Sequence, residues 1–260
     1  MNLGLSHMHT DHDLPIKSTA LSFDILETVH DLDGATLPEI ADYFSKPKST
    51  VHDHLKTLVN IGYLVQDGRT YRVSIKFLNL GGRARIKSPL FQVAEREIQQ
   101  LADDMGEHAN LMVEENGLGI FLYKVKGSQS VNLDTYEGME VYLHTTAMGK
   151  AILAEFSEER RDQIIDQYGL PAVTENTITD RDQLDEELRM IRDRGYAVDN
   201  EERVEGVRCV AAPIMSGSDV VGAVSISAPR SRMSGKKFED DIPTEVLSTV
   251  NVIEVNIQHR

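Results

Sequence analysis

The stretch from Thr36 to Val73, TLPEIADYFSKPKSTVHDHLKTLVNIGYLVQDGRTYRV, constrains the fold of this 260-residue chain more than any other. Glu39 follows Thr36 at the spacing of a capping box, which marks the start of a helix. Apolar residues then recur at helical spacing and predict one buried stripe, formed by Leu37, Ile40, Ala41 and Phe44. Pro47 ends this pattern, because proline lacks a backbone donor and disfavours helix in the residue before it. A short helix followed by a tight turn is therefore expected.

A second helix is predicted directly after Pro47. Its inward positions are apolar, namely Val51, Leu55, Leu58 and Val59, and its opposite face carries hydrogen-bonding side chains. Gly62 ends this helix as a C-terminal cap would. Asp67-Gly68 is a hairpin-turn dipeptide between two predicted strands, 63–66 and 70–73. Helix, turn, helix and hairpin in this order predict a winged helix-turn-helix, in which the second helix enters the major groove of DNA.

We therefore predict that double-stranded operator DNA is a partner of this domain. The expected contacts come from the first turns and outer face of the second helix and from the tip of the wing, namely Lys48, Ser49, Thr50, His52, Asp53, Lys56 and Arg69. Helical pairs also pack in proteins that bind no DNA. The capping box and the hairpin around this pair favour the DNA interpretation.

The charge of the chain is unevenly distributed. The net charge is −15, which by itself argues against a partner made of phosphates. Residues 14–86, however, hold nine Lys and Arg against eight Asp and Glu, whereas residues 87–260 hold 18 against 32. A DNA-binding domain that is only weakly basic should bind non-specific DNA with modest affinity. Its specific binding should therefore depend on a homodimer or homotetramer. An acidic, lysine-poor surface also suits a salt-rich cytoplasm, and a halophilic source is expected.

Composition also limits the class of protein. No apolar run reaches the roughly 18 residues that span a bilayer, and the N-terminus lacks the layout of a signal peptide, so a soluble, cytoplasmic protein with no membrane partner is expected. Cys209 is the only cysteine, which excludes an internal disulfide and a multi-cysteine metal site. We expect no cofactor and no metal. Residues 1–13 are predicted to be a disordered leader, with metal binding by His7, His9 and His12 as the alternative.

The remaining pattern predicts an α+β fold in four parts: the leader 1–13, a DNA-binding domain 14–73, a linker helix 74–88 and an effector domain 89–260. The DNA-binding domain begins with a helix over 18–31, for which Ser18 is the candidate cap. Beyond Pro89 we expect antiparallel strands flanked by helices. The expected helices are 91–105, 147–156, 158–168, 180–194 and one near the C-terminus; the expected strands flank Asn116-Gly117 and lie near Val131, at 207–215 and at 220–227.

The chain resembles the IclR family of transcription regulators from about Ile16 to Asn256. The segments that carry the resemblance are PKSTVHDHLKTLVNIGYL (47–64), LHTTAMGKAIL (143–153), TENTITD (174–180), GYAVDNEERVEGVRCVAAPI (195–214) and GAVSISAP (222–229). The resemblance implies a winged helix, a linker helix used in dimerisation, and a GAF-like domain whose small-molecule effector sets DNA affinity. The chain departs from the family at TALSFDILE (19–27), usually an arginine-bearing ERALDIL-like run, and at His54, usually a bulky aliphatic residue or arginine.

A candidate effector pocket follows from two of these segments. Two threonines and then small residues open a helix near Ala147, whose N-terminal amides suit a carboxylate. Ser225 and Ser227 alternate along an apolar strand, so both hydroxyls face one side and need a polar partner. By resemblance, the pocket comprises Ala147, Met148, Asp199, Cys209, Ser225 and Ser227. The alternatives are backbone-bonded serines, core packing for Met148 and an inert buried thiol for Cys209.

The function expected from these patterns is that of a sequence-specific DNA-binding transcription regulator controlled by a small organic acid. One alternative is a ligand-independent, oligomeric DNA-binding protein. A second is a hydrolase with Cys209 as nucleophile, His144 as base and the amides of residues 147 and 148 as oxyanion hole.

Overall fold

The computed structural model of the protein describes residues 14–259, which divide into two compact units between Ala84 and Arg85. The segment 1–13, for which a leader with three histidines was predicted, lies outside the described residues.

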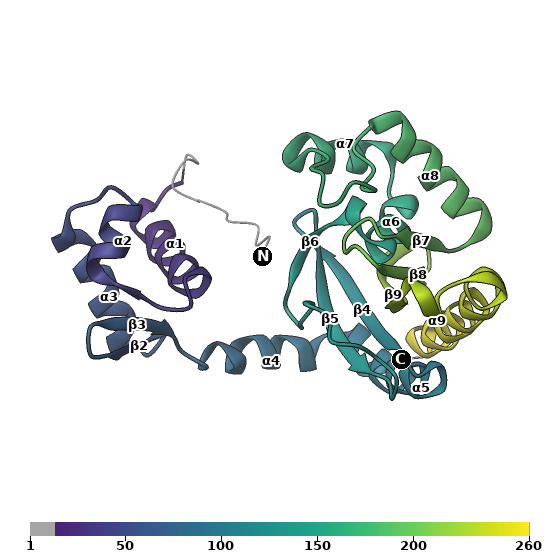
Figure 1. The fold of residues 1–260 in the computed structure, drawn as a ribbon, viewed down its shortest axis with the longest axis horizontal. Helices are drawn as coiled ribbons and strands as arrows, with labels where there is room; N and C mark the ends of the chain where they lie inside the picture. The colour runs from purple at the N-terminus through teal and green to yellow at the C-terminus, as the bar shows by residue number, and fades with distance from the viewer. Residues whose placement is uncertain (1–13, 260) are drawn as a thin grey trace. The chain divides into compact units, whose positions relative to one another are not determined.

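The first unit is a winged helix-turn-helix (Figure 1). It comprises α1 (Lys17–Asp31), β1 (Ala35–Thr36), α2 (Leu37–Tyr43), α3 (Lys48–Asn60), β2 (Leu64–Asp67) and β3 (Thr70–Val73). The three strands pair antiparallel in the order β1-β3-β2, so β1 adds an edge to the wing that the sequence pattern did not predict. The inward stripes meet in one core that includes Ile25, Ile40, Val51 and Leu55.

The start of α2 confirms the capping interaction between Thr36 and Glu39. The Glu39 carboxylate accepts hydrogen bonds from the Thr36 backbone N–H at 2.8 Å and from its hydroxyl at 2.7 Å. The cap predicted for α1 is wrong, because this helix begins at Lys17 after Ile16 and has no side-chain cap. Instead, the Ser22 hydroxyl lies 2.7 Å from Nδ1 of His54 and joins α1 to α3.

Helix α4 (Phe77–Lys87) contains the boundary between the two units. None of its residues is buried, and its apolar side chains include Leu78, which is 74 % exposed, and Ile86. Gly81 and Gly82 lie within the helix. A helix with so little burial depends on a covering surface for most of its stability.

The second unit is built on a six-stranded antiparallel sheet in the order β6-β5-β4-β9-β8-β7. Its strands are β4 (His108–Glu115), β5 (Leu118–Lys126), β6 (Glu140–Tyr142), β7 (Ala197–Asn200), β8 (Val207–Ser216) and β9 (Asp219–Pro229). Its longer helices are α5 (Pro89–Met105), α6 (Ala147–Glu155), α7 (Glu158–Tyr168), α8 (Arg181–Arg194) and α9 (Ile242–Gln258).

The two faces of this sheet carry separate hydrophobic cores. Helices α5 and α9 pack on one face, where Ile98, Val224 and Ile253 belong to one buried cluster. Helix α6 packs on the other face and α8 packs against α6, and Ile152 and Leu188 are buried there (Figure 1). Buried polar side chains, among them Asn110, Ser225 and Ser227, also lie on this second face.

Most predicted elements of the second unit are confirmed, including the hairpin turn at Asn116-Gly117, where both residues have positive φ. The strand predicted near Val131 is wrong. Residues 127–139 contain no helix or strand, and the edge strand β6 begins only at Glu140. The four-residue strand β7 was not predicted, because it is too short to show an alternating pattern.

Candidate functional site

Most of the predicted DNA-contacting side chains lie on the solvent face of α3, and Arg69 lies in the turn of the wing. Ser49, His52, Asp53 and Lys56 are exposed at helical spacing, whereas Val51, Leu55 and Leu58 are buried beneath them. Lys48 and Arg69 are also exposed, and Thr50 is half-buried. His54 points away from this face to Ser22 of α1, so the departure from the family pattern at this position affects helix packing. Burial lowers the pKa of His54.

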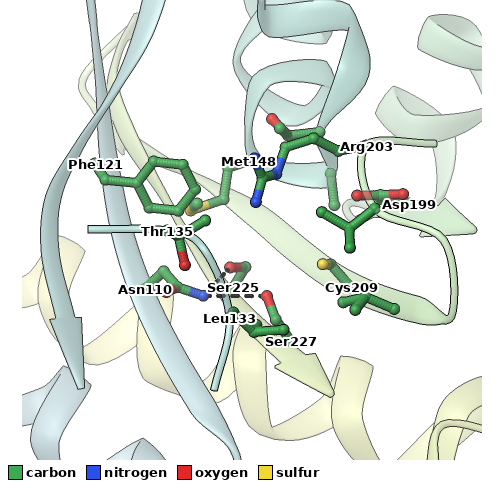
Figure 2. Close-up of a pocket in the computed structure, with 14 residues that line it drawn as sticks. Asn110, Phe121, Leu133, Thr135, Met148, Asp199, Arg203, Cys209, Ser225 and Ser227 are labelled. Atoms are coloured by element: carbon green, nitrogen blue, oxygen red, sulfur yellow. Dashed lines mark hydrogen bonds between the residues drawn. The ribbon is translucent and has the colours of Figure 1, made fainter. Parts of the chain in front are cut away.

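The six predicted effector-site residues lie around one cavity in the second unit (Figure 2). Strand register explains how three of them meet. Asp199 of β7 pairs with Cys209 of β8, and Cys209 pairs with Ser227 of β9. Ser225 lies two residues along β9 and therefore on the same face. Ala147 and Met148, at the start of α6, form another wall of this cavity.

The partner that the serine hydroxyls require is Asn110 of the neighbouring strand β4. Its Nδ2 donates to the hydroxyl oxygens of Ser225 and Ser227, each at 3.1 Å. Because both oxygens accept from Asn110, each hydroxyl can direct its own hydrogen into the cavity. Asn110 is 2 % exposed, and its Oδ1 accepts no hydrogen bond from any residue that the structure describes. The site therefore offers two hydroxyl donors and one buried acceptor.

Asn110 was not predicted, although the sequence of β4 contains a signal for it. His108, Asn110 and Met112 alternate along β4, which places polar side chains on the face opposite Leu111. All three are buried. A buried amide on a strand face needs a polar environment, and this signal could have indicated the site.

The start of α6 is held close to the preceding turn. The Thr146 hydroxyl caps the helix by accepting from the Gly149 N–H at 2.9 Å. A Cβ on Gly149 would come within 2.1 Å of the Leu143 carbonyl oxygen, so only glycine fits there. The cap leaves the N–H groups of Ala147 and Met148 at the positive end of the helix dipole, beside the cavity.

Arg203 also lines the cavity and was not predicted. Figure 2 shows Arg203 and Met148 on one side of the space and the two serines on the other. Arg203 belongs to the loop between β7 and β8, which buried contacts hold in place. Glu202 forms an ion pair with Lys150 of α6, and the Thr177 hydroxyl donates to the Glu202 carbonyl at 2.6 Å. The TENTITD segment thus supports the loop that carries Arg203.

The electrostatics of the cavity favour protonated groups. Burial raises the pKa of Asp199 to about 7, and the nearby Glu202 charge adds to this effect. Burial also raises the pKa of the Cys209 thiol. A protonated thiol is a poor nucleophile. His144 does not line this cavity, because its Nε2 lies 3.1 Å from the Pro171 carbonyl oxygen beside Tyr142 and Tyr168. Cys209 and His144, the nucleophile and base of the alternative hydrolase, are therefore not brought together.

The cavity is small, with a volume of about 30 Å³. A water molecule needs at least about 10–15 Å³ in this measure, so the space accommodates one or two waters. An organic acid can enter only when a lining segment moves. Among residues 14–259, no cluster of His, Cys, Asp and Glu has a metal-binding arrangement, and no helix is long and apolar enough to cross a membrane.

Comparison with known proteins decides the family. Residues 84–255 match the domain described as bacterial transcriptional regulator IclR C-terminal, and residues 20–68 match the IclR helix-turn-helix domain. The chain belongs to the IclR family. Like the other members of this family, it is a DNA-binding transcription regulator and not an enzyme.

Transcriptional regulators from other organisms match most of the chain. The probable transcriptional regulator ArcR of Halobacterium salinarum is 34% identical over 248 residues, which are 94% of each chain. The regulator BhcR of Paracoccus denitrificans is 33% identical over 86% of this chain and 81% of its own length. The relative from Halobacterium salinarum supports the expected halophilic source.

Two solved structures of the family share the fold. The IclR of Thermotoga maritima aligns with a TM-score of 0.73 at 28% identity and covers 93% of this chain and 97% of its own. An IclR homolog of Microbacterium hydrocarbonoxydans, solved in complex with 4-hydroxybenzoate, aligns with a TM-score of 0.78 at 22% identity and covers 94% of this chain and 100% of its own.

Proposed function

We propose that the protein is a sequence-specific transcription regulator whose operator affinity is set by a small carboxylate bound in the cavity of the second unit. The observation that carries this proposal is the convergence of hydrogen-bond donors on one space. The hydroxyls of Ser225 and Ser227, the first amides of α6 and the Arg203 guanidinium all border the cavity. Donors from three separate elements, with a cation among them, suit the two oxygens of a carboxylate.

The DNA-reading part of the proposal assigns base and phosphate contacts to the solvent face of α3 and to the wing. Lys48, Ser49, Thr50, His52, Asp53, Lys56 and Arg69 are the residues proposed for these contacts. Their support is that six of the seven are exposed while the apolar stripe of the same helix is buried. A weakly basic surface of this size favours binding as a dimer on two half-sites.

A second copy of the chain is proposed to cover the exposed apolar residues of α4 and the neighbouring apolar surface of the first unit. Phe23, Ile61 and Leu80 border a hollow of about 530 Å³ between α1, the end of α3 and the start of α4. Leu78 and Ile86 are exposed on α4 itself. Light scattering of the full chain should show a multiple of its 29.1 kDa mass. A monomeric species that binds a single half-site would contradict the dimer.

The effector proposal can be tested by comparing acids with their neutral amides. Thermal shift and operator binding would be measured with acetate, succinate and 4-hydroxybenzoate, each beside its amide. We include 4-hydroxybenzoate because the structural relative from Microbacterium hydrocarbonoxydans was solved with it. At least one acid should stabilise the protein and change operator affinity, and its amide should do neither.

The double variant Ser225→Ala with Ser227→Ala should lose the response to the acid and keep acid-free operator affinity. Ser216→Ala with Ser218→Ala is the matched control, since these serines lie at the far turn between β8 and β9. A protein that ignores every acid, or a double variant that responds as the parent does, would leave ligand-independent DNA binding as the better description.

A further inference from the structure

The segment 127–139 lies over the effector cavity without forming a helix or strand. Leu133 and Thr135 of this segment line the cavity directly. Between them, the Asp134 carboxylate accepts a hydrogen bond from the Arg203 guanidinium at 2.6 Å. The guanidinium of Arg203, the cation that borders the cavity, is thus already paired with a carboxylate of the protein itself.

The two partners of this ion pair are held very differently. The Arg203 side chain is 12 % exposed, and its loop is fixed by the buried Lys150–Glu202 pair. The Asp134 side chain is 59 % exposed on a segment that forms no helix or strand, and the backbone beside it is tied to the sheet by the Lys124 ammonium, which donates to the Thr135 carbonyl at 2.8 Å. An ion pair with one exposed partner is partly screened by solvent and contributes little free energy, so another carboxylate can replace Asp134. Arg203 is the fixed partner and Asp134 the exchangeable one.

The same segment reaches helix α4 through a second ion pair. Glu137 pairs with Arg85, which is the first residue of the second unit and lies within α4. The Arg85 guanidinium also stacks over the rings of Phe91 and Tyr123, at 5.1 and 5.8 Å from their centroids. Asp134, whose carboxylate pairs with Arg203 at the cavity, and Glu137, whose carboxylate pairs with Arg85 of α4, are therefore only three positions apart in the sequence.

We propose that the Arg203 guanidinium binds the effector carboxylate and that the Asp134 carboxylate competes with the effector for this guanidinium. Displacement of Asp134 then changes the ion pair between Glu137 and Arg85. This inference rests on the proposed function. It adds that Arg203 selects an acid over a neutral ligand, and that the effect of binding reaches α4 through Asp134, Glu137 and Arg85. It also accounts for the small cavity, because the acid gains room when the segment moves.

The ligand arm of the test uses acetate, succinate and 4-hydroxybenzoate with their amides, titrated into the full chain by calorimetry. Asp134→Asn removes the competing charge and should tighten acid binding by about fivefold, the upper range for an ion pair that solvent reaches through one partner. Arg203→Gln should weaken acid binding by at least about tenfold, because a charge-assisted contact is lost. The amides should bind the parent and both variants alike.

The double variant and a matched control separate competition from a general loosening of the segment. Asp134→Asn should have no effect in the Arg203→Gln background, since no guanidinium remains to compete for. Asp219→Asn makes the same change at an exposed position in the remote turn between β8 and β9, and should behave as the parent. Tightening by Asp134→Asn that persists without Arg203 would overturn the competition.

The coupling arm measures operator affinity with and without saturating acid. Glu137→Gln should leave the acid dissociation constant of the DNA-free protein within about twofold of the parent, and should reduce the acid-induced change in operator affinity from about tenfold to below about threefold. An unchanged operator response in Glu137→Gln would overturn the route to α4.

The outcomes distinguish this inference from the proposed function. If Ser225→Ala with Ser227→Ala abolishes the response while Asp134→Asn and Arg203→Gln bind acid as the parent does, the pocket stands and the role of Arg203 is wrong. If no acid binds better than its amide to any variant, the proposed function fails and this inference fails with it.

Discussion

The buried ion pair between Lys150 and Glu202 gives the strongest prediction about stability. Lys150 lies on α6 and is only 1 % exposed, with its Nζ 2.6–2.7 Å from the two Glu202 carboxylate oxygens. Glu187 of α8 lies 3.7 Å from the same nitrogen. Lys150→Met keeps the volume of the side chain and removes its charge, which leaves Glu202 buried without its cation.

Removing one partner of a buried pair costs about 3–5 kcal/mol, because the remaining charge loses its compensation. Burial already raises the pKa of Glu202, and Lys150 opposes that rise. For a unit of about 175 residues, each kcal/mol lowers the melting temperature by about 2–4 °C, so Lys150→Met should lower it by about 6–20 °C. Thermal unfolding followed by near-ultraviolet circular dichroism measures this change.

The matched control is Lys236→Met, the same substitution at an exposed lysine whose Nζ lies 3.9 Å from Asp241. Its effect should stay below about 1 kcal/mol. Adding Glu202→Gln to Lys150→Met should recover about 2 kcal/mol, since the uncompensated charge is then gone. Equal melting temperatures for Lys150→Met and Lys236→Met would refute the reasoning about burial.

Further predictions concern the DNA face and the cavity. His52→Ala and Lys56→Ala should each weaken binding to a selected operator by about 1–3 kcal/mol, measured by fluorescence anisotropy, and unchanged affinity and salt dependence in both would contradict the assignment to α3. Arg69→Ala, on the wing, should weaken specific and random DNA about equally in the same assay. Asp199 has a folded pKa of about 7, above its ordinary 3.8, so its contribution to stability is present at low pH and is lost as the pH rises through 7. The stability of the parent relative to Asp199→Asn should therefore fall from about pH 4 to about pH 7 in urea unfolding and stay level above that, whereas a constant difference would show that this carboxyl does not titrate there.

The sequence by itself determined the elements whose signals are local. The Thr36–Glu39 cap, Pro47 after α2 and the Asp67-Gly68 turn each act within a few residues. Each predicted helix and strand of the winged helix-turn-helix is present. The same holds for the hairpin at Asn116-Gly117. The strand expected near Val131 failed because β-branched residues favour a strand only when a neighbouring strand is available to pair.

The residues of the effector cavity show what only the tertiary structure decided. The alternation of Ser225 and Ser227 predicted a polar partner, but Asn110 lies 115 and 117 positions away and meets them through strand register. Arg203 and Lys150 read as ordinary surface cations in a chain with 42 acidic residues. Packing of α6 against the loop after β7 buries Lys150 beside Glu202 and brings Arg203 to the cavity. Register and packing bring together residues that are distant in sequence, and no short-range pattern encodes their pairing.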